Sequence, residues 1–243
     1  MMSSVSEHYE NHLADYYAWI SGGLELKIEE NRKFFVEHNI QPMRSGLAFD
    51  LGAGCGFQSI PLAQLGFRVV AMDLSSKLLA KLKAEAAKLL IETICDDLSN
   101  FKDYQRGDIE LFVCMGDTLT HLDSLRSVQE ILAKTYAALE SGGRLVLSFR
   151  NLAQELCELD RFIPVRSDSR TIFTCFLEYE KDFVKVHDII YEKLGSRWVM
   201  KKGFFRKLRL CPDWIRDYLQ QIGFAIEFYD EQSGMVFIIA RRN

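Results

Sequence analysis

The stretch Phe49-Asp50-Leu51-Gly52-Ala53-Gly54-Cys55-Gly56, followed by Asp73 at the end of the next apolar run, decides the fold of this chain. Apolar residues lead into a glycine loop, the loop leads into a helix, and a second short strand at residues 68–72 then delivers the acid. Glycines let the backbone turn tightly and approach a ligand without an intervening Cβ atom. The acid can accept both hydroxyls of a ribose as charge-assisted hydrogen bonds. This unit therefore predicts a nucleoside-binding site.

The spacing of the glycines indicates which nucleoside is bound. A dinucleotide site reads G-x-G-x-x-G, and here Phe57 stands where its third glycine would be. The observed G-x-G-x-G, after an acid-tipped strand, resembles motif I of the class I S-adenosylmethionine-dependent methyltransferases. Asp73 matches the ribose-binding acid of that family. A tight turn between strand and helix in some other α/β protein is the alternative.

Length and composition limit the possible classes of protein. With 243 residues, 48% of them hydrophobic, the chain can build one large core, or a core with a smaller insertion. A formal net charge of -4 gives no general attraction to nucleic acid or to an anionic membrane. The six cysteines are scattered, mostly in apolar runs, without metal-binding spacing, so we expect buried thiols, a reducing compartment and no metal. No signal peptide or membrane-spanning run is found, and the expected location is cytoplasmic.

Hydrophobic periodicity predicts a helical segment at 7–38, broken at Gly22-Gly23, and then an alternating strand and helix pattern. Strands are predicted at 47–51, 68–73, 92–95, 109–115 and 145–149. Helices are predicted at 59–65, at 76–88 with Ser75 as its cap, and from Ser124 or Ser127 to 139, the last closed by Gly142-Gly143. Three segments between 171 and 210 have partial period-two patterns typical of an antiparallel meander. Helix 213–221 and a hairpin at 224–240 then complete the core.

This order predicts an α/β fold with a doubly wound, mostly parallel sheet. The resemblance implies seven strands, the last of them antiparallel. We expect an N-terminal helical lid at residues 1–45, an S-adenosylmethionine-binding core at 46–150, an antiparallel insertion on the substrate side at 151–210, and a core-completing segment at 211–243.

The resemblance also implies residue roles at the carboxyl edge of the sheet. Asp96 would accept from the adenine amino group, the backbone N–H of Asp97 would reach a ring nitrogen, and Leu98 would lie against the ring. A solvated pair of loop acids is the alternative for Asp96 and Asp97, and simple packing is the alternative for Trp19 in the lid. The expected cofactor-binding residues are Trp19, Asp50, Gly52, Ala53, Gly54, Gly56, Asp73, Leu74, Asp96, Asp97 and Met115.

The acceptor side is expected at Tyr16, His121 and Arg150. The loop after the fourth strand lacks the Asn/Asp-Pro-Pro-aromatic motif that serves methylation of bases and glutamine amides, which disfavours those acceptors. The loop and Arg150-Asn151 resemble small-molecule enzymes of the glycine N-methyltransferase type. His121 could act as a general base, or it could cap or pack at the start of the following helix. The basic run at 201–209 is either a solvated strand face or an attraction for an anionic substrate.

These observations predict a cytoplasmic methyltransferase that transfers the methyl group of S-adenosyl-L-methionine to a small molecule by direct in-line displacement, leaving S-adenosyl-L-homocysteine. The sequence assigns no catalytic residue, no nucleic-acid or membrane partner and no oligomeric state. A non-catalytic S-adenosylmethionine-binding regulatory protein is the main alternative. A protein methyltransferase and an NAD-dependent oxidoreductase are further alternatives.

Overall fold

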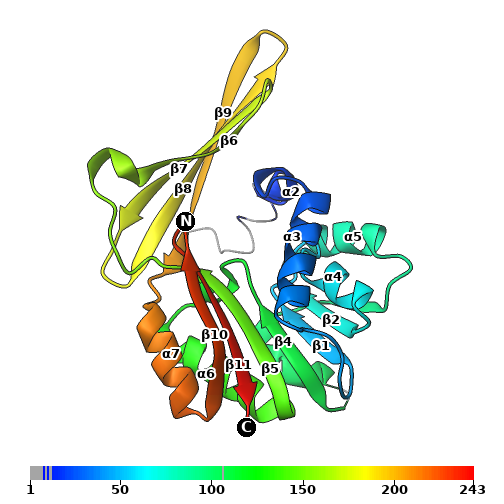
Figure 1. The fold of residues 1–243 in the computed structure, drawn as a ribbon. Helices are drawn as coiled ribbons and strands as arrows, with labels where there is room; N and C mark the ends of the chain where they lie inside the picture. The colour runs from blue at the N-terminus through cyan, green and yellow to red at the C-terminus, as the bar shows by residue number, and fades with distance from the viewer. Residues whose placement is uncertain (1–7, 9, 11–12, 106) are drawn as a thin grey trace.

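The computed structural model describes residues 8, 10, 13–105 and 107–243, and Figure 1 shows their arrangement. The helices are α2 (Tyr17–Ile20), α3 (Leu24–Glu37), α4 (Ser59–Gln64), α5 (Ser76–Glu85), α6 (Leu125–Ala138) and α7 (Pro212–Gln221), with 3-10 turns η2 (Leu98–Tyr104), η3 (Thr118–His121) and η4 (Glu158–Arg161). The strands are β1 (Leu47–Leu51), β2 (Arg68–Asp73), β3 (Ile91–Cys95), β4 (Ile109–Cys114), β5 (Leu139–Arg150), β6 (Phe162–Ser167), β7 (Thr171–Tyr179), β8 (Phe183–Leu194), β9 (Arg197–Leu208), β10 (Phe224–Gln232) and β11 (Met235–Arg242).

The predicted seven-stranded α/β sheet is confirmed. Its strand order is β10-β11-β5-β4-β1-β2-β3, and β11 is antiparallel to both of its neighbours. The chain moves outward from β1 to β3 and then returns to β4 on the other side of β1. The sheet therefore has its switch point between β1 and β4, where a ligand binds in folds of this type.

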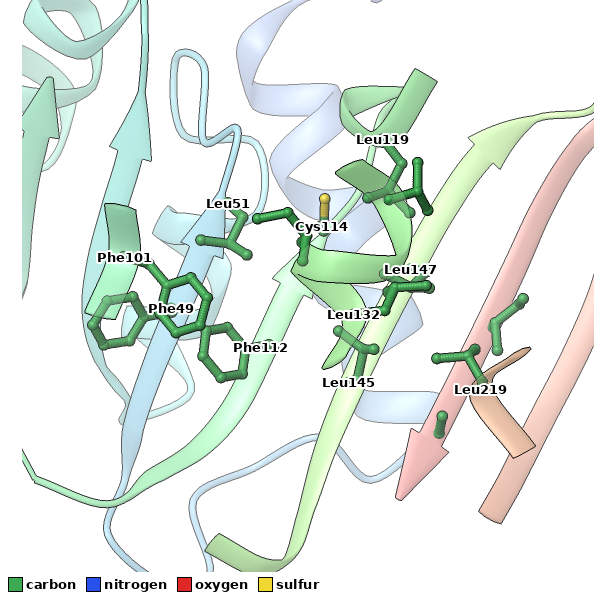
Figure 2. Packing of buried hydrophobic residues seen from close by; sticks show 14 of the residues in the cluster. Phe49, Leu51, Phe101, Phe112, Cys114, Leu119, Leu132, Leu145, Leu147 and Leu219 are labelled. Atoms are coloured by element: carbon green, nitrogen blue, oxygen red, sulfur yellow. The ribbon is translucent and has the colours of Figure 1, made fainter. Parts of the chain in front are cut away.

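Two apolar layers cover the sheet because successive residues of a strand point to opposite faces. Phe49 of β1 packs with Phe101 and Phe112 on the face covered by α6 and α7, as Figure 2 shows. Its neighbour Ala48 belongs to the layer formed with α3, α4 and α5. The predicted caps are also observed. The Ser75 hydroxyl accepts from Leu78 N at 3.2 Å, and Ser124 rather than Ser127 caps α6.

The insertion is a separate antiparallel sheet in the order β6-β7-β8-β9 (Figure 1). The sequence predicted three of its segments and missed β6. That strand lies at the edge of the sheet and contains Pro164, a residue that weakens a strand assignment because it cannot donate to a ladder. The distal β8–β9 hairpin extends away from the core (Figure 1).

Several predicted boundaries and exposures were wrong. Gly142-Gly143 do not close α6, which ends at Ala138, but lie in an irregular part of β5 where the pairing with β4 shifts register. Helix α5 ends at Glu85 rather than at residue 88. Half of the cysteines are exposed, namely Cys95, Cys157 and Cys211, since they lie at or just beyond the ends of elements. The start of the first predicted helix lies outside the described residues. Within the described ranges, no helix is long and apolar enough to cross a membrane.

Candidate functional site

The glycine loop follows β1 and turns beneath the end of β2. The backbone N–H groups of Gly52 and Ala53 both donate to the carbonyl of Met72 at 2.9 Å. Gly52 has φ +81°, and a Cβ there would lie 2.2 Å from Thr118 Oγ1. A side chain would therefore need both a rare backbone conformation and space that Thr118 occupies.

Asp73, at the end of β2, holds the loop in place. Its Oδ2 accepts from the backbone N–H of Gly54, and its Oδ1 accepts from that of Ser75, both at 2.8 Å. Burial raises the pKa of this carboxyl, while the two backbone donors oppose the shift. Each oxygen keeps a further lone pair, so the carboxylate can still accept hydroxyl groups from a ligand.

Asp96 and Asp97 follow β3 on the same edge. The Asp96 carboxylate accepts from Tyr104 Oη at 2.8 Å and from Asn100 Nδ2 at 3.1 Å, and the Tyr104 hydroxyl is the main cause that lowers its pKa. The Asp97 N–H, which the resemblance assigned to a ring nitrogen, donates to Asp96 Oδ1 at 2.7 Å. The Asp97 side chain instead caps η2 through Ser99 N.

A cavity of about 520 Å³ joins these parts at the carboxyl edge. It extends from the glycine loop past Asp73 to Asp96, and on the other side to Thr118, His121 and the first turns of α6. A nucleoside with an amino-acid tail fits a space of this size and lining. Two acids and the glycine loop lie at one end of this cavity, where the sequence predicted the ribose and adenine sites.

The comparisons with known proteins agree with this geometry. Residues 48–143 match the model of a methyltransferase domain. A glycine/sarcosine N-methyltransferase of Parasynechococcus marenigrum is 35% identical over 104 residues, which cover 42% of this chain and 37% of that protein. Another, from Aphanothece halophytica, is 26% identical over 157 residues, covering 60% and 57%. The matches thus span less than two thirds of these relatives.

Solved structures match over almost the whole chain. Streptomyces venezuelae DesVI superposes with a TM-score of 0.76 at 16% identity, covering 97% of this chain and 100% of that one. The CcbJ methyltransferase of Streptomyces caelestis gives 0.75 at 18% identity, covering 89% and 96%. Residues 48–143 therefore form a methyltransferase domain, and the whole chain has the fold of the class I S-adenosylmethionine-dependent methyltransferases. The cofactor prediction, S-adenosyl-L-methionine, is confirmed with the family.

About half of the predicted site residues line the cavity. These are Gly52, Gly54, Asp73, Leu74, Asp96, Asp97 and His121, together with Leu98. Residues that the prediction left out also line it, namely Tyr17, Ser75, Leu78, Gly116, Thr118 and, on or before α6, Asp123, Ser127, Glu130, Ile131 and Lys134. The only sequence signal for the residues on or before α6 was the prediction of a helix after the fourth strand, which would begin at the same edge of the sheet.

Other predicted cofactor residues do not line the cavity but support it. Asp50 is buried under the loop, where its Oδ2 accepts from Ser59 Oγ at 2.6 Å. Ala53 and Met115 are buried in the core layer of α3, α4 and α5. A Cβ at Gly56 would lie 2.4 Å from Leu82 Cδ1, so this glycine lets α5 pack closely against the loop.

The remaining predicted residues contact the inserted sheet or its base. Trp19 packs against the inserted sheet, with the Arg166 guanidinium 5.5 Å from its ring. This position agrees with the alternative that Trp19 is a packing residue. The Tyr16 hydroxyl bonds with Glu192 and with Lys201 Nζ. Arg150 lies 3.8 Å from Asp117 Oδ2 through its Nε. The neighbour Tyr17, rather than Tyr16, is the lid tyrosine at the cavity. Its ring stacks on Phe57 at 5.4 Å.

A buried charge cluster joins the core to the insertion beside the cavity. Asp117, in the left-handed conformation with φ +78°, accepts from Lys207 Nζ of β9 at 2.6 Å and from Arg150 N at 2.5 Å. Burial alone would raise its pKa, but the charges of Lys207 and Arg150 outweigh burial and lower it to about 2. Burial, aided by Lys207, lowers the pKa of His121 to about 3, so this histidine is neutral at pH 7.

Asp50 gives a prediction about stability. Burial raises its pKa to about 7, and among the described residues no group donates to its Oδ1. The native state therefore binds a proton that the unfolded chain has lost, and stability falls as pH rises from about 4 to 7. Asparagine cannot ionise, so the Asp50→Asn variant should not lose this stability. We expect the difference in free energy of unfolding between the variant and the wild type to be about 3 kcal/mol more favourable to the variant at pH 8 than at pH 5. Thermal denaturation of both proteins at both pH values tests this. An equal effect at the two pH values would contradict it.

Proposed function

We propose that this chain transfers the methyl group of S-adenosyl-L-methionine to a small-molecule acceptor by direct in-line displacement. The observation that carries the proposal is the cavity that joins the glycine loop and Asp73 to Thr118 and His121. When bound, the cofactor supplies an electrophilic methyl group on a sulfonium leaving group. The protein has to hold the two reactants in line and exclude water, which can contribute about 7–11 kcal/mol.

We assign the cofactor contacts by position. Asp73 would hold the ribose, Asp96 and Leu98 the adenine, and the backbone from Gly52 to Gly54 the amino-acid tail. Asp50, Ala53, Gly56 and Met115 would act by supporting the loop.

The acceptor would enter on the side of Tyr17 and His121. A neutral imidazole can accept a hydrogen bond from an N–H or O–H group and so orient the lone pair of the acceptor. With a pKa of about 3, His121 is a weak base, so the acceptor would have to enter the site in its neutral form, an ammonium group having first lost its proton to solvent. An amino nitrogen is the first acceptor atom to test, because several relatives are named glycine/sarcosine N-methyltransferases.

The inserted sheet of residues 151–210 would set acceptor specificity. It lies outside the matched domain, and its Phe205 ring is 5.4 Å from His121. We retain the proposed division into lid, core, insertion and core-completing segment on this basis. The cytoplasmic location stays a prediction.

Two measurements test the function. Calorimetric titration with S-adenosylhomocysteine, with NADH as control, tests the site. Turnover of methyl-labelled S-adenosylmethionine with pools of amines and of hydroxyl compounds tests the activity. Binding without turnover on any pool would favour a regulatory binding protein, and binding of NADH alone would favour an oxidoreductase.

The Asp96→Ala variant tests the adenine assignment. Asp96 is solvent-accessible, so we expect a loss of affinity for S-adenosylhomocysteine of only about tenfold, with the fold unchanged. Asp103→Ala, at an exposed position in η2, is the matched control. Equal affinity in the two variants would argue against a contact between Asp96 and the cofactor.

A further inference from the structure

Alternate residues of the inserted sheet face away from the core. In β8, Val184, Val186, Asp188 and Ile190 are buried, whereas the residues between them are more accessible. The buried set packs on the side of the candidate site, with Leu13, Tyr16 and Trp19 of the N-terminal segment. Because side chains alternate along a strand, the other set forms a second face, which we call the outer face.

The outer face carries apolar side chains on all four strands. Ile172, Tyr191 and Met200 are direct neighbours in register on β7, β8 and β9. A second row runs from Phe162 through Phe176 and His187 to Phe204, with successive ring centroids 4.7, 5.7 and 5.6 Å apart. Ile189 and Lys193 belong to the accessible set of β8 and so lie on the same face. Trp198 of β9 lies there too, because it pairs with Lys193, and Lys202 lies there because it pairs with Ile189.

Many of these side chains are exposed. The exposed fractions are 49% for Phe162, 40% for Ile172, 39% for Tyr191, 44% for Trp198 and 48% for Met200. Together they present on the order of 500 Å² of contiguous apolar surface, since a large aromatic side chain covers roughly 150–250 Å² in full. Soluble monomers rarely leave such a patch uncovered, and an antiparallel sheet normally turns polar residues to solvent.

Four charged side chains on this face pair with one another. Lys185 Nζ lies 3.1 Å from Glu178 Oε1 and 3.0 Å from Glu180 Oε1, and Arg206 lies 2.9 Å from Glu180 Oε2. Lys193 and Lys202 lie on the same face, and the Lys193 Nζ is 5.9 Å from the centroid of the Trp198 ring, so the face has a small positive excess. The aromatic row spans the whole sheet rather than only the hairpin tip, which favours a broad apolar partner over a membrane surface that the tip alone would reach.

We propose that the outer face is the interface at which a second copy of this chain packs, sheet against sheet, about a twofold axis. A twofold interface uses the same patch on both subunits, which suits an apolar surface on which most of the charges are already paired. Sheets pack face to face at about 10 Å by interdigitating such residues. The patch of about 500 Å² would supply a large part of the roughly 800 Å² that each partner buries in a stable interface.

The test is the mass of the full chain in solution by light scattering and sedimentation at about 1–100 μM. A monomer is 28.0 kDa, and we expect twice that mass for the wild type. The Tyr191→Asp/Trp198→Asp variant is expected to weaken self-association by about 100-fold or more. The Met43→Asp/Leu90→Asp variant is the matched control, because these two residues lie outside the inserted sheet and are even more exposed, at 73% and 69%. It should self-associate as the wild type does.

Either of two results would overturn the proposal. One is a wild-type chain that stays at 28.0 kDa at the highest concentration. The other is an interface variant, folded by circular dichroism, that self-associates like the wild type. Met200→Asp alone is the second variant if the double substitution does not fold. A monomeric wild type that sediments with phosphatidylserine vesicles would show that a membrane covers the face instead.

Discussion

Replacing Asp73 by alanine is expected to weaken binding of S-adenosylhomocysteine by about 100-fold or more, because two hydrogen bonds to a charged acceptor contribute roughly 1.5–3 kcal/mol each. Its two oxygens each accept one backbone N–H, from Gly54 and from Ser75. The substitution thus removes the proposed ribose contacts and also the bonds that fix the glycine loop. Calorimetric titration measures the loss.

Two further variants separate these effects. Asp73→Asn keeps one carbonyl acceptor in place, and we expect an intermediate loss of affinity. Asp108→Ala removes an exposed acid before β4 and should bind as the wild type does. Unchanged affinity in Asp73→Ala, with an unchanged melting temperature, would exclude Asp73 as the ribose-binding acid.

Replacing Asp117 by alanine is expected to lower the free energy of unfolding by about 3–5 kcal/mol, the usual effect of leaving a buried charge without its partner. The side chains of Asp117 and Lys207 are only 11% and 13% exposed, and their bond is 2.6 Å long. Alanine would also have to adopt φ +78°, which asparagine and aspartate tolerate better. Urea denaturation measures the effect, which is large against a typical stability of about 5–15 kcal/mol.

A double-mutant cycle with Lys207→Met tests the cause. Removing both charges should destabilise less than the sum of the two single substitutions. Asp117→Asn should lose less than Asp117→Ala. Since the folded pKa is about 2, below the usual 3.8, the stabilisation is complete above about pH 4 and is lost as pH falls through 2. Additive effects in the cycle would argue against a coupled pair.

Local sequence was sufficient for the core of the fold. The first four strands, from Leu47–Leu51 to Ile109–Cys114, are short apolar runs bounded by a glycine, a helix cap or an acid. Their bounds in the structure lie within one residue of the predicted bounds. The turn of the last hairpin, Ser233-Gly234, has positive φ at both residues, as a tight two-residue turn requires. Such signals depend on backbone geometry that a few neighbouring residues determine.

The site was predictable only where a role belongs to the backbone or to the end of a strand. Gly52, Gly54, Asp73 and Asp96 line the cavity because parallel strands end at one edge. Trp19, Tyr16 and Arg150 were placed at the site by analogy alone, and their partners come from the inserted sheet, as with Tyr16 and Glu192, 176 residues apart. No local pattern encodes such a contact.

The sequence by itself thus determined the doubly wound sheet, the glycine loop and the acids at the strand ends, because turn conformations and hydrophobic periodicity are local properties. The tertiary structure alone decided which tyrosine faces the cavity, that Lys207 of β9 neutralises Asp117, and that the insertion has a second apolar face. These features depend on the register and packing of segments that are distant in the chain. Such packing is set by the complementarity of whole surfaces rather than by the preference of any short segment.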